Sequence, residues 1–300
     1  MKLQLLIRTF ISVLLIQSVA HANNSETSCG EEPSKSQKIY NKKLKLQAED
    51  MGLKLRAFFA EKAEMVALVS RAGGDLSDRQ WAYPEKQKYT HTGIAVKDSA
   101  TSKWKFVHEL NDCAGPSSSI HEQGLAEFFM DDPFMFDVVV VIPSVELQKK
   151  ILAVIEDKSV GKKGLARALH NSRYSNIANP YSTDYQNSNM WVLSVIAAAQ
   201  SGAKTQTAAL NYYKRNGFKP SQVKLSGLES MFGQLFTKNA KTEDHTDEEN
   251  SSGWFKFVSS VSVNKYVKDN DKVLAEKTLC HRNGCDIRIK GTLIPAPQED

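Results

Sequence analysis

The stretch that decides the fold is Trp191-Val192-Leu193-Ser194-Val195-Ile196-Ala197-Ala198-Ala199-Gln200, which is apolar on almost every side. A helix that is hydrophobic all round is buried in the centre of a protein. The polar turn Tyr185-Gln186-Asn187-Ser188-Asn189-Met190 leads directly into it. The sequence therefore predicts a central buried helix with polar side chains at its N-terminal end.

Helical and strand-like segments surround this helix in a definite order. Residues 38–62 carry apolar side chains at steps of three and four, the spacing of a helix with one buried face. Strand-like runs follow at residues 65–72, 90–96, 104–110 and 137–143. Helical patterns return at residues 144–158, 161–170 and 203–216, with Ser144 as an N-cap and Gly217 as a C-cap. This order favours an α+β fold.

The C-terminal part of the chain has a different pattern. Residues 238–252 are acidic and polar without an apolar anchor, which predicts a solvated loop or linker. Residues 254–267 and 274–294 are typical of β-strands. We therefore expect an α+β domain at 23–237, the linker at 238–252, and a C-terminal β-hairpin extension at 253–300 packed on the same domain.

The first 22 residues are expected to be a cleavable signal peptide. Lys2 and Arg8 form a basic region, residues 9–19 are uncharged and apolar, and Ala20-His21-Ala22 fits a signal peptidase site. An uncleaved membrane anchor is the alternative, but the apolar run is shorter than the roughly 20 residues that span a bilayer. No later segment is long and apolar enough to be a transmembrane segment, so a periplasmic or secreted protein is expected.

The charge of the chain is too small to indicate nucleic-acid binding. Removal of the leader takes away two basic residues and lowers the formal net charge from +5 to +3.

Four cysteines in an exported chain favour disulfide bonds. Cys280 and Cys285 flank an Asn-Gly turn between two strand-like runs, so we expect them to pair. Cys29 and Cys113 are then left to each other. A zinc site at Cys280 and Cys285 would lack a second pair of ligands. No cofactor is expected.

His91 and Glu109 are candidates for acid–base chemistry. His91 begins a strand, and Gly93 leaves room beside it for a substrate or another side chain. A turn symmetric about Ala100 would place Glu109 opposite His91, where its carboxylate could orient the imidazole. A register slip of one residue would substitute His108. The alternative is an ordinary strand histidine and a surface glutamate.

Ser188 is a candidate nucleophile, because the positive end of the helix dipole favours an anionic oxygen there. Serine is also a common N-cap, a role that Asn187 or Asn189 could share. Cys113 is a second candidate nucleophile, although its expected disulfide and its loop position argue against it. Several polar residues near the turn could line a cleft or stabilise an oxyanion, or they could form a buried hydrogen-bonded loop. They are Tyr174, Asn176, Asn179, Tyr185 and Asn187.

Six segments together resemble an uncharacterised bacterial family known as domain of unknown function 2145, from about Cys29 to Lys268. They are Arg71-Ala72-Gly73-Gly74-Asp75-Leu76, Tyr89-Thr90-His91-Thr92-Gly93, Phe106-Val107-His108-Glu109-Leu110-Asn111, Glu122-Gln123-Gly124-Leu125-Ala126-Glu127-Phe128-Phe129, Asn179-Pro180-Tyr181-Ser182 and Gln186-Asn187-Ser188-Asn189.

The order of histidine on a strand, acidic residue on the next strand and nucleophile at a buried helix also resembles the circularly permuted NlpC-like branch of the papain superfamily. The resemblance implies a papain-like core of antiparallel sheet packed on helices, with activity on amide or ester bonds of peptidoglycan peptides or lipids. It implies that His91 is the general base, that Glu109 orients it, and that Ser188 stands where the family has cysteine. The expected function is therefore a hydrolase or acyltransferase of the cell envelope. The alternative is a non-catalytic envelope protein that binds a peptide or lipid or serves as a structural partner; the oligomeric state is not predicted.

Overall fold

The computed structural model describes residues 35–60, 64–72, 80, 82–112, 116–130, 136–160, 164–225, 239–281, 288–289 and 292–293. The chain divides into two units, Met1–Lys42 and Lys43–Asp300. In the first unit, only the beginning of one helix is described. The sheet and the candidate site lie in the second unit.

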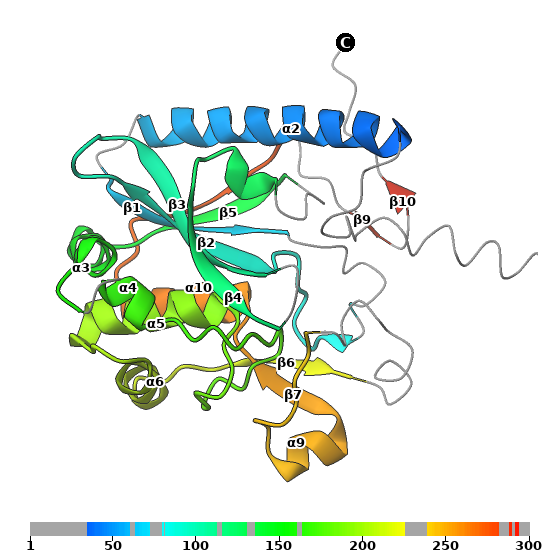
Figure 1. The fold of residues 1–300 in the computed structure, drawn as a ribbon, viewed down its shortest axis with the longest axis vertical. Helices are drawn as coiled ribbons and strands as arrows, with labels where there is room; N and C mark the ends of the chain where they lie inside the picture. The colour runs from blue at the N-terminus through cyan, green and yellow to red at the C-terminus, as the bar shows by residue number, and fades with distance from the viewer. Residues whose placement is uncertain are drawn as a thin grey trace, which may run out of the picture. The chain divides into compact units, whose positions relative to one another are not determined.

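The second unit is built on a six-stranded antiparallel sheet of order β4-β3-β2-β1-β5-β8 (Figure 1). The strands are β1 Val66–Arg71, β2 His91–Lys97, β3 Trp104–Asn111, β4 Ser118–Gln123, β5 Val138–Ile142 and β8 Ala275–Leu279. β1 is buried along its whole length, because it pairs with β2 and β5 at its two edges and its side chains lie in apolar clusters on both faces. The strands expected from 65–72, 90–96, 104–110 and 137–143 are confirmed, whereas β4 was not expected.

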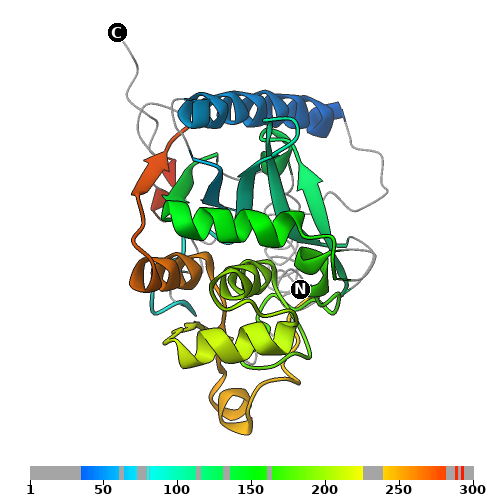
Figure 2. The same cartoon turned by 90° about the vertical axis from the view of Figure 1, so that its left-hand side faces the viewer.

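Helices cover both faces of the sheet, as Figures 1 and 2 show. On one face, α2 (Lys35–Ala60) packs Met51, Leu55 and Phe59 with Val69 of β1 in one apolar cluster. The other face is covered by α3 (Val145–Glu156), α5 (Ser188–Ser201) and α10 (Ser260–Asn270), with α4 (Leu165–Ala168) and α6 (Gln206–Arg215) beside them. The α+β class with an antiparallel sheet packed against helices is thus confirmed.

Helix α5 is the central buried helix that the sequence predicts. Its residues from Ser188 to Ala199 are all buried. It begins three residues before Trp191, because Asn187 supplies the cap that ends the preceding turn. The expected cap of α3 is also present, since the Ser144 hydroxyl accepts a hydrogen bond from the backbone N–H of Leu147 at 3.2 Å.

The segment from residue 239 onward differs from the expected linker and β extension. Helix α9 (Asp247–Ser252) begins with a capping box, and His245 before it is buried. Strand β7 (Trp254–Phe257) pairs with β6 (Ser221–Lys224), and the chain then forms α10 where a strand was expected. Strands β7 and β8 lie within the ranges 254–267 and 274–294 where strands were expected, and β8 forms an edge of the main sheet.

Several expectations fall outside the described residues. The proposed signal peptide, Cys29, Cys113 and Cys285 all lie there, so both disulfide pairings stay predictions. Cys280 follows β8 directly, and the short strands β9 (Arg288–Ile289) and β10 (Thr292–Leu293) pair with each other. Within the described part of the chain, no helix has the length and apolar character needed to cross a membrane.

Candidate active site

Ser188 is the first residue of α5, and Asn187 is its N-cap. The Asn187 side-chain oxygen accepts a hydrogen bond from the Met190 N–H at 2.8 Å. The Asn187 amide nitrogen donates to the carbonyl oxygens of Asn176 at 3.1 Å and Val258 at 3.2 Å. Because Asn187 caps the helix, the Ser188 hydroxyl is not needed for capping and instead lies 3.0 Å from Nδ1 of His91.

His91 joins Ser188 to a line of polar side chains that crosses three strands. Its Nε2 lies 2.8 Å from Nδ1 of His108 on β3, and Nε2 of His108 lies 2.7 Å from the amide oxygen of Gln123 at the end of β4. We call this series of Ser188, His91, His108 and Gln123 the relay. The pairing of His91 with Ser188 joins two of the three residues predicted from the sequence.

Glu109 does not take the predicted place beside His91. The β2–β3 register pairs Val96 with Lys105, one residue away from the expected partner Trp104. Since side chains alternate between the two faces of a strand, this slip turns Glu109 to the opposite face and brings His108 to the face of His91. The sequence predicts His108 at this place only if the register slips by one residue. It gives no signal for Gln123, because its pattern does not predict β4.

Glu109 is fully buried on its own face of β3. Burial raises the pKa of its carboxyl to about 8, and the nearby Ser118 hydroxyl lowers it less. Neither carboxyl oxygen has a hydrogen-bond partner of normal geometry among the described residues. The Ser118 hydroxyl instead lies 2.9 Å from Nε2 of His170. Glu109 is therefore a protonated, buried acid at neutral pH, separated from the relay by the sheet.

Both histidines of the relay are held in the neutral form. Burial, followed by the charge of Arg71, keeps the pKa of His91 well below its usual value of 6.5. The same causes lower the pKa of His108 to about 3, although its hydrogen bond to Gln123 opposes them. Arg71 pairs with His91 across β1 and β2, and its guanidinium lies 5.2 Å from the centre of the Phe128 ring.

Gly93 lets an aromatic ring pack beside the histidines. A β-carbon at Gly93 would lie 2.6 Å from Cε2 of Phe128, closer than real contacts allow. The Phe128 ring stacks on Phe106 with centroids 3.8 Å apart and meets the His108 ring edge to face at 5.1 Å. The space that the sequence predicts beside His91 is thus filled by Phe128 and not left to a substrate.

Asn189 ties the start of α5 to the start of β2. Its amide nitrogen donates to the Thr90 carbonyl at 3.0 Å, and its oxygen accepts from the Ser260 hydroxyl of α10 at 3.2 Å. Ser260 in turn accepts from the Thr92 hydroxyl at 2.9 Å. These bonds hold residues on both sides of His91 and so fix its distance to Ser188.

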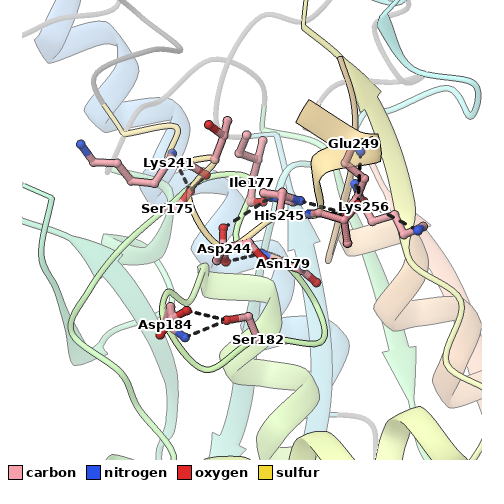
Figure 3. A network of polar contacts seen from close by, with 12 residues as sticks. Ser175, Ile177, Asn179, Ser182, Asp184, Lys241, Asp244, His245, Glu249 and Lys256 are labelled. Atoms are coloured by element: carbon pink, nitrogen blue, oxygen red, sulfur yellow. Dashed lines mark hydrogen bonds and ion pairs between the residues drawn. The ribbon is translucent and has the colours of Figure 1, made fainter. Parts of the chain in front are cut away.

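The loop before α5 is anchored to the segment that precedes α9, as Figure 3 shows. The backbone and side-chain nitrogens of Asn179 donate to Asp244 at 2.8 and 2.9 Å. Nε2 of His245 donates to the Ile177 carbonyl at 2.7 Å, and the Lys241 N–H donates to the Ser175 hydroxyl at 3.0 Å. A hydrogen-bonded loop therefore positions the residues leading to Ser188.

The five residues predicted to line a cleft belong to this loop or flank α5. Asn179 and Asn187 make the bonds given above, and the Asn176 N–H donates to the Asn239 carbonyl at 2.7 Å. The guanidinium carbon of Arg173 lies 4.5 Å from the centre of the Tyr185 ring. The backbones of Tyr174 and Gln186 form an isolated parallel β-bridge. These contacts fit the hydrogen-bonded loop that was the alternative, and a role in lining a cleft stays a prediction.

The site contains a hydroxyl, a neutral imidazole in contact with it and backbone N–H groups at a helix start. Trp191 N–H bonds to the Asn187 carbonyl and Met190 N–H to its side chain, whereas the first two N–H groups of a helix have no acceptor inside it. Among the residues that the structure describes, no three histidine, cysteine, aspartate or glutamate side chains are grouped as metal ligands. The arrangement can support transfer of the Ser188 proton to His91.

Fold and site together define an α+β protein with a serine–histidine pair between the first turn of a buried helix and the start of an antiparallel strand. The chain belongs to the bacterial family described as "Uncharacterized protein conserved in bacteria (DUF2145)", whose model matches residues 59–267. A solved structure, the metalloprotein yiiX from Escherichia coli O157:H7 (DUF1105), is similar with a TM-score of 0.37 and 16% identity over 72% of this chain and 96% of that chain. No curated protein matches this chain.

Proposed function

We propose that this protein is a serine-dependent hydrolase or acyltransferase acting on amide or ester bonds, with Ser188 as nucleophile and His91 as general base. The observation that carries the proposal is the 3.0 Å contact between Ser188 Oγ and His91 Nδ1, made while Asn187 fills the capping role. A nucleophile, a base within hydrogen-bond reach and a third group that orients the base are the signature of nucleophilic catalysis. His108 is the orienting group in this proposal.

The reaction proceeds in two halves. Ser188 Oγ attacks the carbonyl carbon while its proton passes to Nδ1 of His91, and the tetrahedral intermediate collapses as that proton passes to the leaving amine or alcohol. The acyl group stays on Ser188. Water, or a second amine or alcohol, then attacks the acyl carbon and loses its proton to His91. The bond between the acyl carbon and Oγ breaks, His91 returns the proton to Oγ, and the acyl product leaves.

The start of α5 supports this chemistry. The N–H groups of Ser188 and Asn189 lie at the positive end of the α5 dipole and can donate to an oxyanion. The relay, in contrast, contains no carboxylate, so it supplies no countercharge to the imidazolium formed during attack. We therefore expect slow turnover and a base that stays unprotonated below the usual histidine pKa.

The permuted NlpC-like relationship and the envelope location belong to the same proposal. They are supported by the nucleophile at the start of a buried helix, the base on an antiparallel strand, the polar third group on the next strand, and the signal-peptide pattern of residues 1–22. The proposed substrates are envelope peptides, peptidoglycan or lipids. Ser188 and His91 are 5% and 8% exposed, so little of either side chain is accessible to a substrate.

A fluorophosphonate probe tests the proposal, because it forms a covalent bond with an activated serine. The wild-type protein should incorporate one phosphonyl group by intact mass, and Ser188→Ala should incorporate none. Ser201→Ala is the matched control, since Ser201 is an exposed serine at the other end of the same helix and should not affect labelling. Labelling that survives Ser188→Ala contradicts the proposal, and no labelling of any form favours the non-catalytic binding protein.

A further inference from the structure

We propose that Gln123 is a positioning residue that sets the direction of every hydrogen bond in the relay and so keeps Nδ1 of His91 able to accept the Ser188 proton. The inference rests on the proposed function for its catalytic consequence. Its structural part concerns the protonation of two histidines and stands independently of any activity.

Each imidazole of the relay has two ring nitrogens and holds one proton. A neutral imidazole carries one N–H, so one ring nitrogen donates and the other accepts. His91 and His108 are both buried and both neutral at pH 7. In a line of two such rings, the choice made at one end therefore determines the role of every nitrogen.

Gln123 makes that choice at the end of the line. Its amide oxygen, 2.7 Å from Nε2 of His108, can only accept, so Nε2 of His108 carries the proton. Nδ1 of His108 must then accept from Nε2–H of His91 across 2.8 Å. Nδ1 of His91 is left without a proton, and it accepts from the Ser188 hydroxyl across 3.0 Å.

The opposite direction would disable the base. If the amide nitrogen of Gln123 faced His108, each proton would move to the other ring nitrogen, and His91 would donate Nδ1–H to the serine oxygen. A protonated Nδ1 cannot take the serine proton. Gln123 thus acts on the reacting atoms only through His108 and His91, from the far end of the relay.

Long-range ¹H–¹⁵N spectra of protein labelled at histidine identify which ring nitrogen carries a proton in each ring. At pH 7, we expect Nδ1 of both His91 and His108 to be unprotonated and both Nε2 atoms to be protonated. Gln123→Leu should replace this single pattern at His108 with a mixture of tautomers, whereas Gln123→Glu, which keeps an acceptor oxygen, should retain it and raise the pKa of His108.

The rate of fluorophosphonate labelling supplies the catalytic readout. Gln123→Leu should slow labelling about tenfold, through loss of one hydrogen bond and of the competent tautomer, and Gln123→Glu should restore most of the rate. Glu122→Gln is the control on the same strand, because Glu122 forms an exposed ion pair with Lys105 outside the relay.

Each outcome supports or overturns the inference. A protonated Nδ1 on His91 in the wild-type protein overturns it, as does an unchanged tautomer pattern in Gln123→Leu. If the spectra agree but no form is labelled, the direction of the relay stands and the proposed function fails. If Gln123→Leu does not fold, as judged by circular dichroism, Gln123→Glu decides: a retained tautomer pattern with a raised pKa of His108 supports the inference, and an unchanged pKa of His108 overturns it.

Discussion

Replacement of Glu109 by glutamine should stabilise the protein at neutral pH and leave the site intact. The folded-state pKa of Glu109 is about 8, against 4.5 for an ordinary glutamate. Below pH 4.5 both the folded and the unfolded chain hold the proton, so the carboxyl has no effect. As the pH rises, the unfolded chain ionises first, and stability is lost until the pH passes about 8. The loss amounts to about 3 kcal/mol at pH 7, since one pKa unit corresponds to about 1.4 kcal/mol.

Urea unfolding of wild type and Glu109→Gln at pH 4.5, 6 and 7.5 measures this difference. The variant should gain about 3 kcal/mol relative to wild type between the lowest and highest pH, because glutamine does not ionise. Glu122→Gln should show little change, since an exposed ion pair contributes little. A constant difference across this range refutes the buried, protonated state of Glu109. Slower fluorophosphonate labelling of Glu109→Gln would contradict its separation from the relay and would support the predicted role of Glu109 in orienting His91.

Three further predictions concern the groups around the relay. Labelling of Ser188 should show no loss as the pH falls through 6.5, because the pKa of His91 lies well below that value; a pH–rate profile with a midpoint near 6.5 would contradict this. Asn187→Ala should lower the free energy of unfolding by about 1–2 kcal/mol through loss of the α5 cap, measured by urea denaturation, and an unchanged value would refute the capping role. Gly93→Ala should lower the free energy of unfolding by about 1–3 kcal/mol, since the new β-carbon meets the Phe128 ring. Thermal melting measures this, and an unchanged melting temperature would contradict it.

Apart from β4, the strands of the main sheet and the central helix could be predicted because their signals are local. The apolar run at 191–200 has no polar face, and Ser144 precedes a helical pattern directly, so neighbouring residues decide the outcome. β5 likewise forms an apolar β-branched run that is buried except at Val139. In these segments, propensity, pattern and burial favour the same structure.

The register of β2 and β3 could not be predicted because it depends on the geometry of one turn. The Asp98 side chain accepts hydrogen bonds from the N–H groups of Ala100 and Thr101, and Ser102 adopts a left-handed φ of 56°. This turn pairs Lys97 with Trp104 and removes the symmetry about Ala100. The turn is one residue shorter than a turn symmetric about Ala100. This difference places His108, and not Glu109, beside His91 in the candidate site.

The valines in the segment that forms α10 favour the prediction of a strand, although the structure has a helix there. Val261 and Val263 alternate with polar residues as in a strand, and valine favours β structure. Ser259 and Ser262 form a capping box that begins a helix, and Val263 and Val267 then lie buried on one face. Ser260 of this helix donates a hydrogen bond to Asn189, so a prediction of a strand here leaves out one of the contacts that support the site.

The central claim is that His91 activates Ser188, and the rate and position of fluorophosphonate attachment test it most directly. We expect peptide mapping of the labelled wild-type protein to place the phosphonyl group on Ser188. His91→Ala should slow its attachment by roughly 10²- to 10⁴-fold, the usual contribution of a general base. Attachment at another residue, or an unchanged rate in His91→Ala, would contradict the account.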